Sequence, residues 1–247
     1  MKLLIFLLYA LAVSAVMARR GFWSPSSPQI KSTGRRIERL LVVGATGGTG
    51  RELVNQALER GYEVTAFVRN PAKMQLTHPR LKIMQGDVFD ANSVDAAVRG
   101  QDAVVSALGH RRIFVPSRVQ AEGARNVLRA MEAHGVKRFV CETSLGLGNS
   151  VGRMGLLSTF FVLPLILPIY FWDKSRQEQV IAASALEWVI VRPGVLTNGA
   201  KRGVYRHGFD VGSYLWSERI GRADVADFML NQLTDDQYLQ TALGVVW

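Results

Sequence analysis

Residues 42–53, VVGATGGTGREL, place four glycines within seven positions. Glycine inside a helix or strand costs up to about 1 kcal/mol, so such a cluster marks backbone that turns sharply or approaches another group closely. Gly44 permits a tight turn, Gly47 lets the backbone approach a diphosphate, and Gly50 lets a following helix pack closely on a sheet. The cluster has one residue more between its first two glycines than the usual G-x-G-x-x-G fingerprint. It predicts a site for the diphosphate of a dinucleotide, at the N-terminus of a helix.

A pair of cations follows the next predicted strand. In FVRNPAKM, Arg69 lies nineteen residues after Gly50, and Lys73 lies one helical turn later. A carboxylate at this position would bind the 2′-hydroxyl of the adenosine ribose, whereas an arginine accommodates a 2′-phosphate. Because this stretch contains no acid, the sequence predicts NADP as the cofactor.

Three side chains further along could place and protonate an acceptor. Hydride chemistry belongs to the cofactor, so the protein must supply position, electrostatics and a proton. Tyr170 and Lys174 are four residues apart in YFWDK and share one face of a helix. A nearby ammonium favours the phenolate, which suits a tyrosine to act as general acid at a carbonyl. Ser144 is the third candidate; its alternative role is a turn residue, and that of Tyr170 is an aromatic that closes an apolar flap.

The elements that must position these side chains alternate along the chain. Short β-branched runs predict strands buried on both faces, and apolar stripes between them predict amphipathic helices. Such alternation implies right-handed crossovers and a parallel sheet covered on both sides, a doubly wound α/β fold with its ligand at the carboxyl ends of the strands. The strands are expected at residues 39–44, 62–68, 81–87, 102–108, 137–143 and 187–193. Three helices are expected from their apolar stripes: Leu53, Val54, Ala57 and Leu58 in the first, Ala121, Ala124, Leu128 and Met131 in the second, and Val225, Met229 and Leu233 in the third.

Charge is concentrated at the N-terminus. The 247 residues carry a formal charge of +10, and residues 1–37 contribute six basic residues and no acid, which leaves 10 − 6 = +4 for the rest. That remainder is ordinary for a folded domain, and no recognition helix or aromatic-basic pattern accompanies it, so nucleic acid is not an expected partner. Cys141 is the only cysteine, so an intramolecular disulfide is excluded, in keeping with a reducing compartment.

Residues 3–18 contain no charge and are followed by Arg19 and Arg20. Residues 1–20 therefore resemble a signal peptide, with cleavage after Ala18, or a membrane anchor whose following positive charges keep the domain on the cytoplasmic face. Residues 21–38 form a basic linker, and the acid-free stretch also permits an organelle transit sequence. We expect either membrane association with the domain in a reducing, NADPH-containing compartment, or organelle targeting.

Residues 155–172 form a second charge-free stretch, interrupted by Pro164 and Pro168. A hydrophobic lid over the substrate and a surface that dips into a bilayer both fit this composition. A second transmembrane helix is the alternative, but it would separate the fifth predicted strand from the sixth.

Six motifs occur in the order typical of one family: GATGGTG, FVRNPAK, GDV, QDAVVSALG, EGARNVLRAMEAHGVKRFV and VRPG. With them, residues 39–247 resemble the atypical short-chain dehydrogenase/reductases, especially the NAD(P)H-binding group that includes flavin reductase/biliverdin-IXβ reductase and the NmrA-like proteins. The resemblance implies a Rossmann-type domain over residues 39–247. The Tyr-x-x-x-Lys spacing matches that of short-chain dehydrogenases, and residues 173–194 resemble the family helix that begins beside the nicotinamide ribose.

The resemblance also implies roles for individual positions. The residues that would wrap the diphosphate are Gly44, Thr46, Gly47, Thr49 and Gly50, and those that would bind the 2′-phosphate are Arg69 and Lys73. Asp87 and Val88 would border the adenine, and Leu108 and Gly109 would flank the ribose and nicotinamide. Thr143 and Ser144 would lie beside the nicotinamide, and residues 192–194, Pro193 included, would close the far wall of the pocket. The flavin reductase has a histidine after its paired prolines, where this chain has Gly194, so flavin and biliverdin are less expected as substrates.

These observations predict an NADPH-dependent reductase of a hydrophobic carbonyl, quinone, flavin or tetrapyrrole-like acceptor, with Ser144, Tyr170 and Lys174 as catalytic residues. The alternative is a non-catalytic NADPH-binding redox sensor of NmrA-like type that presents residues 155–172 to a partner. His78, His110, His134 and His207 have no metal-ligand spacing, so no metal is expected. His110 directly follows Gly109 and could face the substrate.

Overall fold

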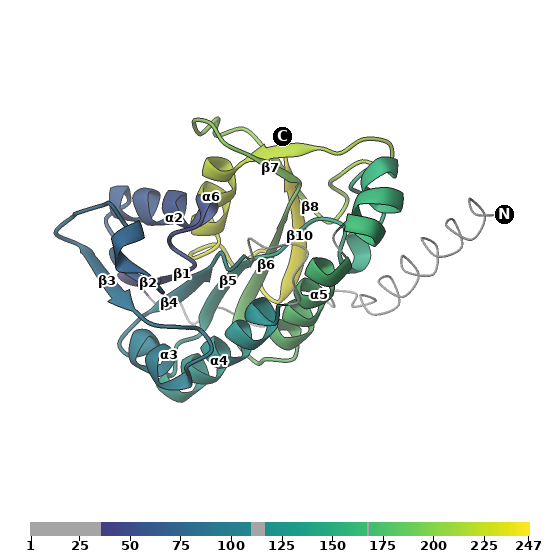
Figure 1. The fold of residues 1–247 in the computed structure, drawn as a ribbon. Helices are drawn as coiled ribbons and strands as arrows, with labels where there is room; N and C mark the ends of the chain where they lie inside the picture. The colour runs from purple at the N-terminus through teal and green to yellow at the C-terminus, as the bar shows by residue number, and fades with distance from the viewer. Residues whose placement is uncertain (1–35, 110–116, 167) are drawn as a thin grey trace.

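A mostly parallel sheet of eight strands forms the centre of the protein (Figure 1). The computed structural model describes residues 36–109, 117–166 and 168–247. The strand order is β3-β2-β1-β4-β5-β6-β10-β8, and only β8 runs antiparallel to its neighbour. The strands are β1 (Arg39–Val43), β2 (Glu63–Val68), β3 (Leu81–Gln85), β4 (Ala103–Ser106), β5 (Arg138–Glu142), β6 (Glu187–Pro193), β8 (Arg206–Gly208) and β10 (Thr241–Val246).

Helices cover both faces of this sheet (Figure 1). On one face lie α2 (Gly48–Glu59) and α6 (Arg222–Asn231), and on the other lie α3 (Ala91–Val98), α4 (Val119–His134) and α5 (Pro168–Ala182). Side chains of β1 alternate between the two cores, because successive residues of a strand point to opposite faces. The chain moves outward from β1 to β3 and returns to β4, so the order reverses between β1 and β4. This reversal opens the crevice where doubly wound sheets bind ligands.

The predicted doubly wound fold is confirmed, with differences at three strands of the sheet. β3 is not buried on both faces: Lys82, Ile83 and Gln85 are exposed because β3 is an edge strand with only β2 beside it. The prediction also missed β10, the parallel strand next to β6, and the short antiparallel β8 beside it. Gly244 divides the apolar run of β10, and a Cβ at this position would lie 3.1 Å from Leu145 and 3.3 Å from Val211, so other chain segments approach closely there.

The predicted helical stripes are buried in α2, α4 and α6, except that Leu233 lies beyond the end of α6. Smaller elements complete the chain. A second sheet pairs β7 (Val195–Thr197) with β9 (Arg219–Gly221), and η1 (Pro71–Lys73) and η2 (Gly148–Ser150) are short 3-10 helices.

Residues 155–172 do not form one helix. A π-helix, η3 (Ser158–Ile166), is followed by α5, which begins at Pro168, and β5 remains paired with β6. Across the described ranges, no helix combines the length and apolar character that crossing a bilayer requires. The predicted anchor at residues 1–20 lies outside the described residues, as does the linker up to residue 35.

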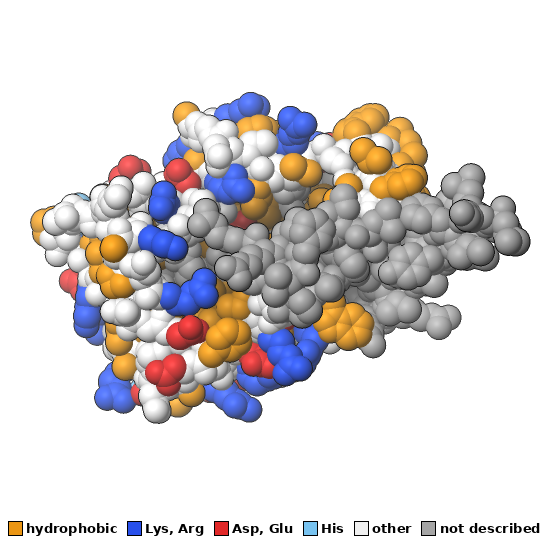
Figure 2. Space-filling view, viewed as in Figure 1, with side chains coloured by type: hydrophobic (Ala, Val, Ile, Leu, Met, Phe, Trp, Pro, Cys, Tyr) orange, Lys and Arg blue, Asp and Glu red, His pale blue; other side chains and the backbone are white. Residues whose placement is uncertain are grey.

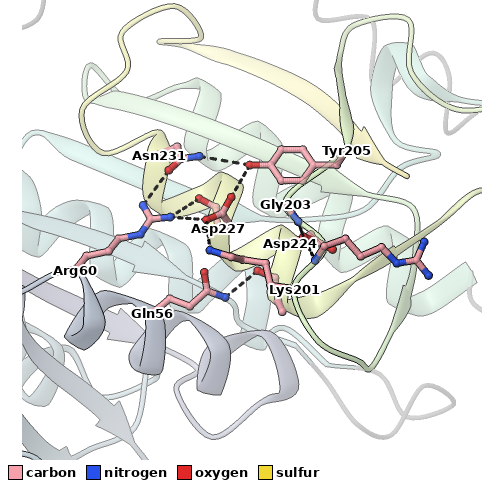
Figure 3. A network of polar contacts seen from close by, with 10 residues as sticks. Gln56, Arg60, Lys201, Gly203, Tyr205, Asp224, Asp227 and Asn231 are labelled. Atoms are coloured by element: carbon pink, nitrogen blue, oxygen red, sulfur yellow. Dashed lines mark hydrogen bonds and ion pairs between the residues drawn. The ribbon is translucent and has the colours of Figure 1, made fainter.

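Asp224 and Asp227 attach residues 201–205 to α6 (Figure 3), and Asp224 also binds Trp247. The fully buried Asp224 accepts hydrogen bonds from the backbone N–H groups of Arg202 (2.9 Å) and Gly203 (2.8 Å) and from Trp247 Nε1 (2.9 Å). One turn later, Asp227 accepts from Arg60, Lys201 and Tyr205. These two carboxylates therefore join three separate parts of the chain.

Replacing Asp224 with alanine leaves three donors without their acceptor. A hydrogen bond to a charged group contributes about 1.5–3 kcal/mol, and water can replace the acceptor for the exposed residues Arg202 and Gly203, so we expect Asp224→Ala to lower the free energy of unfolding by about 2–4 kcal/mol. Urea denaturation measures the change through the midpoint at constant m. The control is Asp210→Ala, whose exposed carboxylate pairs with Arg153; it should alter stability by less than about 0.5 kcal/mol. Equal midpoints for the two variants would contradict the role of Asp224.

Candidate cofactor and active site

The glycine turn after β1 is built by close backbone contacts. Gly44 has φ of +82° and accepts a hydrogen bond of 2.9 Å from the N–H of Gly47. A Cβ on Gly50 would lie 2.1 Å from the Gly44 carbonyl oxygen, and one on Gly44 would lie 2.6 Å from the carbonyl oxygen of Ala107. Both positions therefore require glycine, as the sequence predicts.

This turn opens the N-terminus of α2 to solvent. Gly47 is the N-cap, Gly47 and Gly48 are exposed, and Thr46 is half-buried. No described side chain caps these N–H groups, and the first turn contains no acid. Free N–H groups and the positive end of the helix dipole fit the diphosphate of a dinucleotide. Thr49 differs from the other positions, because its hydroxyl donates to the buried Glu142 at 3.1 Å and leaves only its backbone for a ligand.

Arg69 and Lys73 lie at the end of β2 and are exposed. Sequence reasoning missed a third cation there: Arg51, in the first turns of α2, reaches the Lys73 carbonyl oxygen at 3.4 Å. None of the three forms an ion pair with a described carboxylate. Their charges are therefore available to a phosphate. The signal in the sequence was a cation close to a helix N-terminus, where the dipole disfavours it.

The wall beyond β3 and β4 is formed by Val88 and Leu108. Both are buried, and a Cβ on Gly123 would lie 3.0–3.1 Å from their side chains, so the three pack together. Asp87 accepts the N–H of Phe89 at 3.0 Å and shapes the turn after β3. Gly109 is exposed, with open space where a Cβ would lie. The predicted substrate contact of His110 lies outside the described residues.

Lys174 and Tyr170 meet, as their spacing predicts. The Lys174 Nζ is buried, donates to the Thr143 carbonyl oxygen at 2.9 Å and lies 5.4 Å from the centroid of the half-buried Tyr170 ring. Burial disfavours the ammonium, but attraction to Tyr170 and Glu142 outweighs it, so the pKa of Lys174 lies above its ordinary value. Asp173 fixes this end of α5 by accepting backbone N–H groups at the start of α4.

Thr143 and Ser144 follow β5 but have different partners. The Thr143 hydroxyl donates to Glu178 at 2.7 Å, so it holds α5 rather than pointing freely into the site. Arg192 completes this link with bonds of 2.9 and 2.7 Å to the same carboxylate. Ser144 is half-buried and donates to the Leu145 carbonyl oxygen at 3.0 Å, which leaves its oxygen able to accept.

Pro193 and Gly194 end β6. Pro193 is buried, and its carbonyl oxygen accepts the N–H of Leu145 at 2.9 Å. A Cβ on Gly194 would lie 2.5 Å from the carbonyl oxygen of Glu218. Close contact with the segment that leads into β9 thus accounts for glycine at this position, where a histidine could not fit without movement.

Glu142 is a site residue that sequence reasoning missed. It ends β5, and burial raises the pKa of its carboxyl group, with the charges of Lys174 and Arg222 and the hydrogen bond from Thr49 opposing that rise. It thereby connects α2 to the Lys174 region. An acid at the end of an apolar strand, in KRFVCET, was the available signal.

The described histidines make structural contacts. His78 accepts the N–H of Arg80, His134 lies 2.7 Å from Asp95, and His207 lies 3.1 Å from the Tyr238 hydroxyl. In the part of the chain that the structure describes, no group of three His, Cys, Asp or Glu residues could hold a metal ion.

Comparisons with known sequences identify several relatives. An uncharacterized chloroplastic protein of Arabidopsis thaliana is 33% identical over 176 residues, which cover 68% of this chain and 62% of that protein. A 3β-hydroxysteroid dehydrogenase/Δ5→4-isomerase of Mycobacterium tuberculosis is 36% identical over 119 residues, 44% of this chain and 32% of the relative. The chloroplastic protein TIC 62 of Oryza sativa is 28% identical over 68% of this chain and 37% of its own length. The matches thus span less than two thirds of these relatives.

Solved structures share the fold. The anaerobilin reductase ChuY of Escherichia coli superposes with a TM-score of 0.70 at 24% identity, covering 84% of this chain and 96% of that one. A short-chain dehydrogenase/reductase of Veillonella parvula, solved in complex with NADP, gives a TM-score of 0.70 at 17% identity over 86% and 95% of the two chains. The expected kinship with atypical short-chain dehydrogenase/reductases is confirmed. Because the model of the NAD(P)H-binding family matches residues 44–236, well over half of the chain, the protein belongs to that family.

Proposed function

We propose that the protein is an NADPH-dependent reductase of a hydrophobic carbonyl, quinone, flavin or tetrapyrrole-like acceptor. The observation that carries this proposal is the buried Lys174 ammonium beside the Tyr170 ring, next to the end of β5. A phenol held near a permanent positive charge is suited to proton transfer. Family membership supplies the cofactor class, and the cations near β2 favour NADPH over NADH.

The residues present fit the cofactor. The cradle formed by Gly44, Gly47 and Gly50 would hold the diphosphate, and Arg51, Arg69 and Lys73 would hold the 2′-phosphate. When bound, NADPH supplies a hydride to the acceptor.

The chain's own residues would then manage position and protons. Tyr170 donates its phenolic proton to the acceptor oxygen, and Lys174 stabilises the phenolate that remains. Glu142 supports the charge of Lys174, and Thr143 fixes its ammonium through a carbonyl oxygen. Ser144 can accept a hydrogen bond from an N–H or O–H group of the bound molecule, since its own proton is already engaged. Ser144 therefore positions the acceptor and does not transfer a proton.

An apolar surface supports the choice of a hydrophobic acceptor. Figure 2 shows apolar side chains gathered at the upper right, over the segment that precedes α5. Leu156, Leu157 and Phe161 are exposed there, and residues 213–217 add Tyr214, Leu215 and Trp216. The two segments are joined by a 2.8 Å bond from the Gly155 N–H to the Ser213 carbonyl oxygen and by the Ser158 and Ser217 hydroxyls, 2.7 Å apart. Contiguous exposed apolar area on a soluble domain marks a binding surface.

The same surface favours a second candidate function, a non-catalytic NADPH-binding redox sensor that presents it to a protein partner. Association with a membrane through residues 1–20 and 155–172 is a separate proposal, compatible with either function. An organelle location is supported by the acid-free residues 1–37 and by two relatives that are chloroplastic proteins.

We expect the protein to bind NADPH at least about tenfold more tightly than NADH, because the 2′-phosphate gains charge-assisted hydrogen bonds. Titration of both cofactors, followed by fluorescence or calorimetry, measures this. Arg69→Asp should lower NADPH affinity by about tenfold or more and leave NADH affinity within about twofold. Arg99→Asp, on the exposed end of α3, controls for net charge. Equal affinity for the two cofactors, or an unchanged Arg69→Asp variant, would remove the NADP assignment.

Tyr170→Phe deletes the proposed proton donor while keeping the ring. We expect turnover of NADPH with the best of a panel of quinones, flavins and aldehydes to fall about 10²- to 10⁴-fold, with NADPH affinity nearly unchanged. Lys174→Met should lower turnover as well. Tyr62→Phe should not, because Tyr62 precedes the start of β2, whereas the site lies at the carboxyl ends of the strands. Full turnover by both site variants would leave a reductase without this proton donor. If the wild type turns over no acceptor but captures a partner only with NADPH, the sensor is the correct function.

A further inference from the structure

Gly48 is the glycine of the cluster that the dinucleotide fingerprint leaves unexplained. A Cβ at this position would lie 2.5 Å from Arg222 Cδ and 2.6 Å from Arg222 Nε, and the next nearest atom is Arg222 Cζ at 3.5 Å. Gly48 therefore makes room for one side chain, that of Arg222. The contact joins the first turn of α2 to the first residue of α6.

Arg222 is unusual among the cations near α6. Lys201 and Arg60 pair with Asp227, and Arg206 pairs with Glu218. Arg222 is half-buried and donates to the neutral Asn198 side chain at 2.7 Å, and no carboxylate within the described part of the chain forms an ion pair with it. Its guanidinium therefore keeps donors and charge for another group.

The location of this guanidinium disfavours it in the absence of an anion. It lies against the positive end of the α2 dipole, whose first turn holds no acid to offset it. Arg51 adds a second cation to the same helix end. Two arginines beside exposed N–H groups raise the electrostatic potential of one small region, and a bound anion turns this repulsion into attraction.

The two arginines lie on different sides of that helix end. Arg51 reaches the Lys73 carbonyl oxygen, near the proposed 2′-phosphate contacts. Arg222 comes from α6, contacts Asn198 just after β7, and acts by its charge on Glu142 at the end of β5. The proposed nicotinamide contacts also follow β5. Arg222 is therefore on the nicotinamide side of the diphosphate.

We propose that Arg222 binds the phosphate on the nicotinamide side of the NADPH diphosphate, and that Gly48 is present to admit its side chain. The proposal rests on the proposed NADPH-dependent function, and it assigns to Arg222 a binding role that the glycine fingerprint does not contain.

The test compares NADPH with adenosine 2′,5′-bisphosphate, which has the 2′-phosphate and only the adenosine-side 5′-phosphate. Arg222→Ala should weaken NADPH binding about tenfold and binding of the bisphosphate by less than about twofold. Arg51→Ala should weaken both ligands, and Arg99→Ala, an exposed arginine of an i,i+4 pair, should weaken neither. Thermal unfolding of each free variant checks that the fold is intact.

Gly48→Ala tests the second half of the proposal. In the wild-type background its Cβ displaces the flexible Arg222 side chain, so NADPH affinity should fall about tenfold with little change in thermal unfolding. In the Arg222→Ala background the nearest obstructing atoms are gone, so the same change should cost less than about a further twofold. An additive loss would show that the Cβ blocks the ligand directly and would overturn the proposal, as would wild-type NADPH affinity in Arg222→Ala. Failure of the wild type to bind NADPH would instead refute the proposed function.

Discussion

The close packing of α2 on the turn after β1 is the constraint on which the rest of the site depends. Gly50 has no side chain, so the helix can lie where a Cβ would be 2.1 Å from the Gly44 carbonyl oxygen. This places the N-terminus of α2 directly above the carboxyl end of β1. It also directs Thr49 toward the end of β5 and Gly48 toward the start of α6. One backbone contact thus brings the positive end of the helix dipole, the buried Glu142 and the cation Arg222 close together at the carboxyl end of β1.

Charges must then be accommodated in the interior, since four charged side chains are buried: Glu142 and Arg192 at the ends of β5 and β6, and Lys174 and Glu178 on α5. Buried charges are costly unless they are paired and hydrogen-bonded. Arg192 and Glu178 satisfy this condition with two hydrogen bonds, and Lys174 satisfies it with the Thr143 carbonyl oxygen and the charge of Glu142. The arrangement fixes the backbone after β5 and the start of α5. Tyr170 and Ser144, the side chains nearest to solvent, are therefore carried by rigid supports.

Local signals in the sequence predicted the parts of this architecture that depend on neighbouring residues. β-branched runs located six strands, and the spacing of Tyr170 and Lys174 placed them together. Contacts between distant segments were not predictable. Thr49 and Glu142 are 93 residues apart, and Gly48 and Arg222 come from opposite ends of the domain, so only the strand order brings either pair together. The burial of β3 was mispredicted for the same reason, because its edge position depends on which strand pairs with it and not on its own residues.

The packing of α2 against α6 gives these long-range contacts a common basis. Gln56 donates to the Ala223 carbonyl oxygen at 2.8 Å, and Arg60 pairs with Asp227 at 2.7 Å, so two turns of α2 are attached to α6 beyond Gly48. At the end nearest the site, the same pair of helices brings Arg222 to Gly48. A dinucleotide held there would contact residues from both ends of the domain. Because a ligand that binds only the folded chain stabilises it by mass action, such binding would strengthen the same α2–α6 packing that assembles its site.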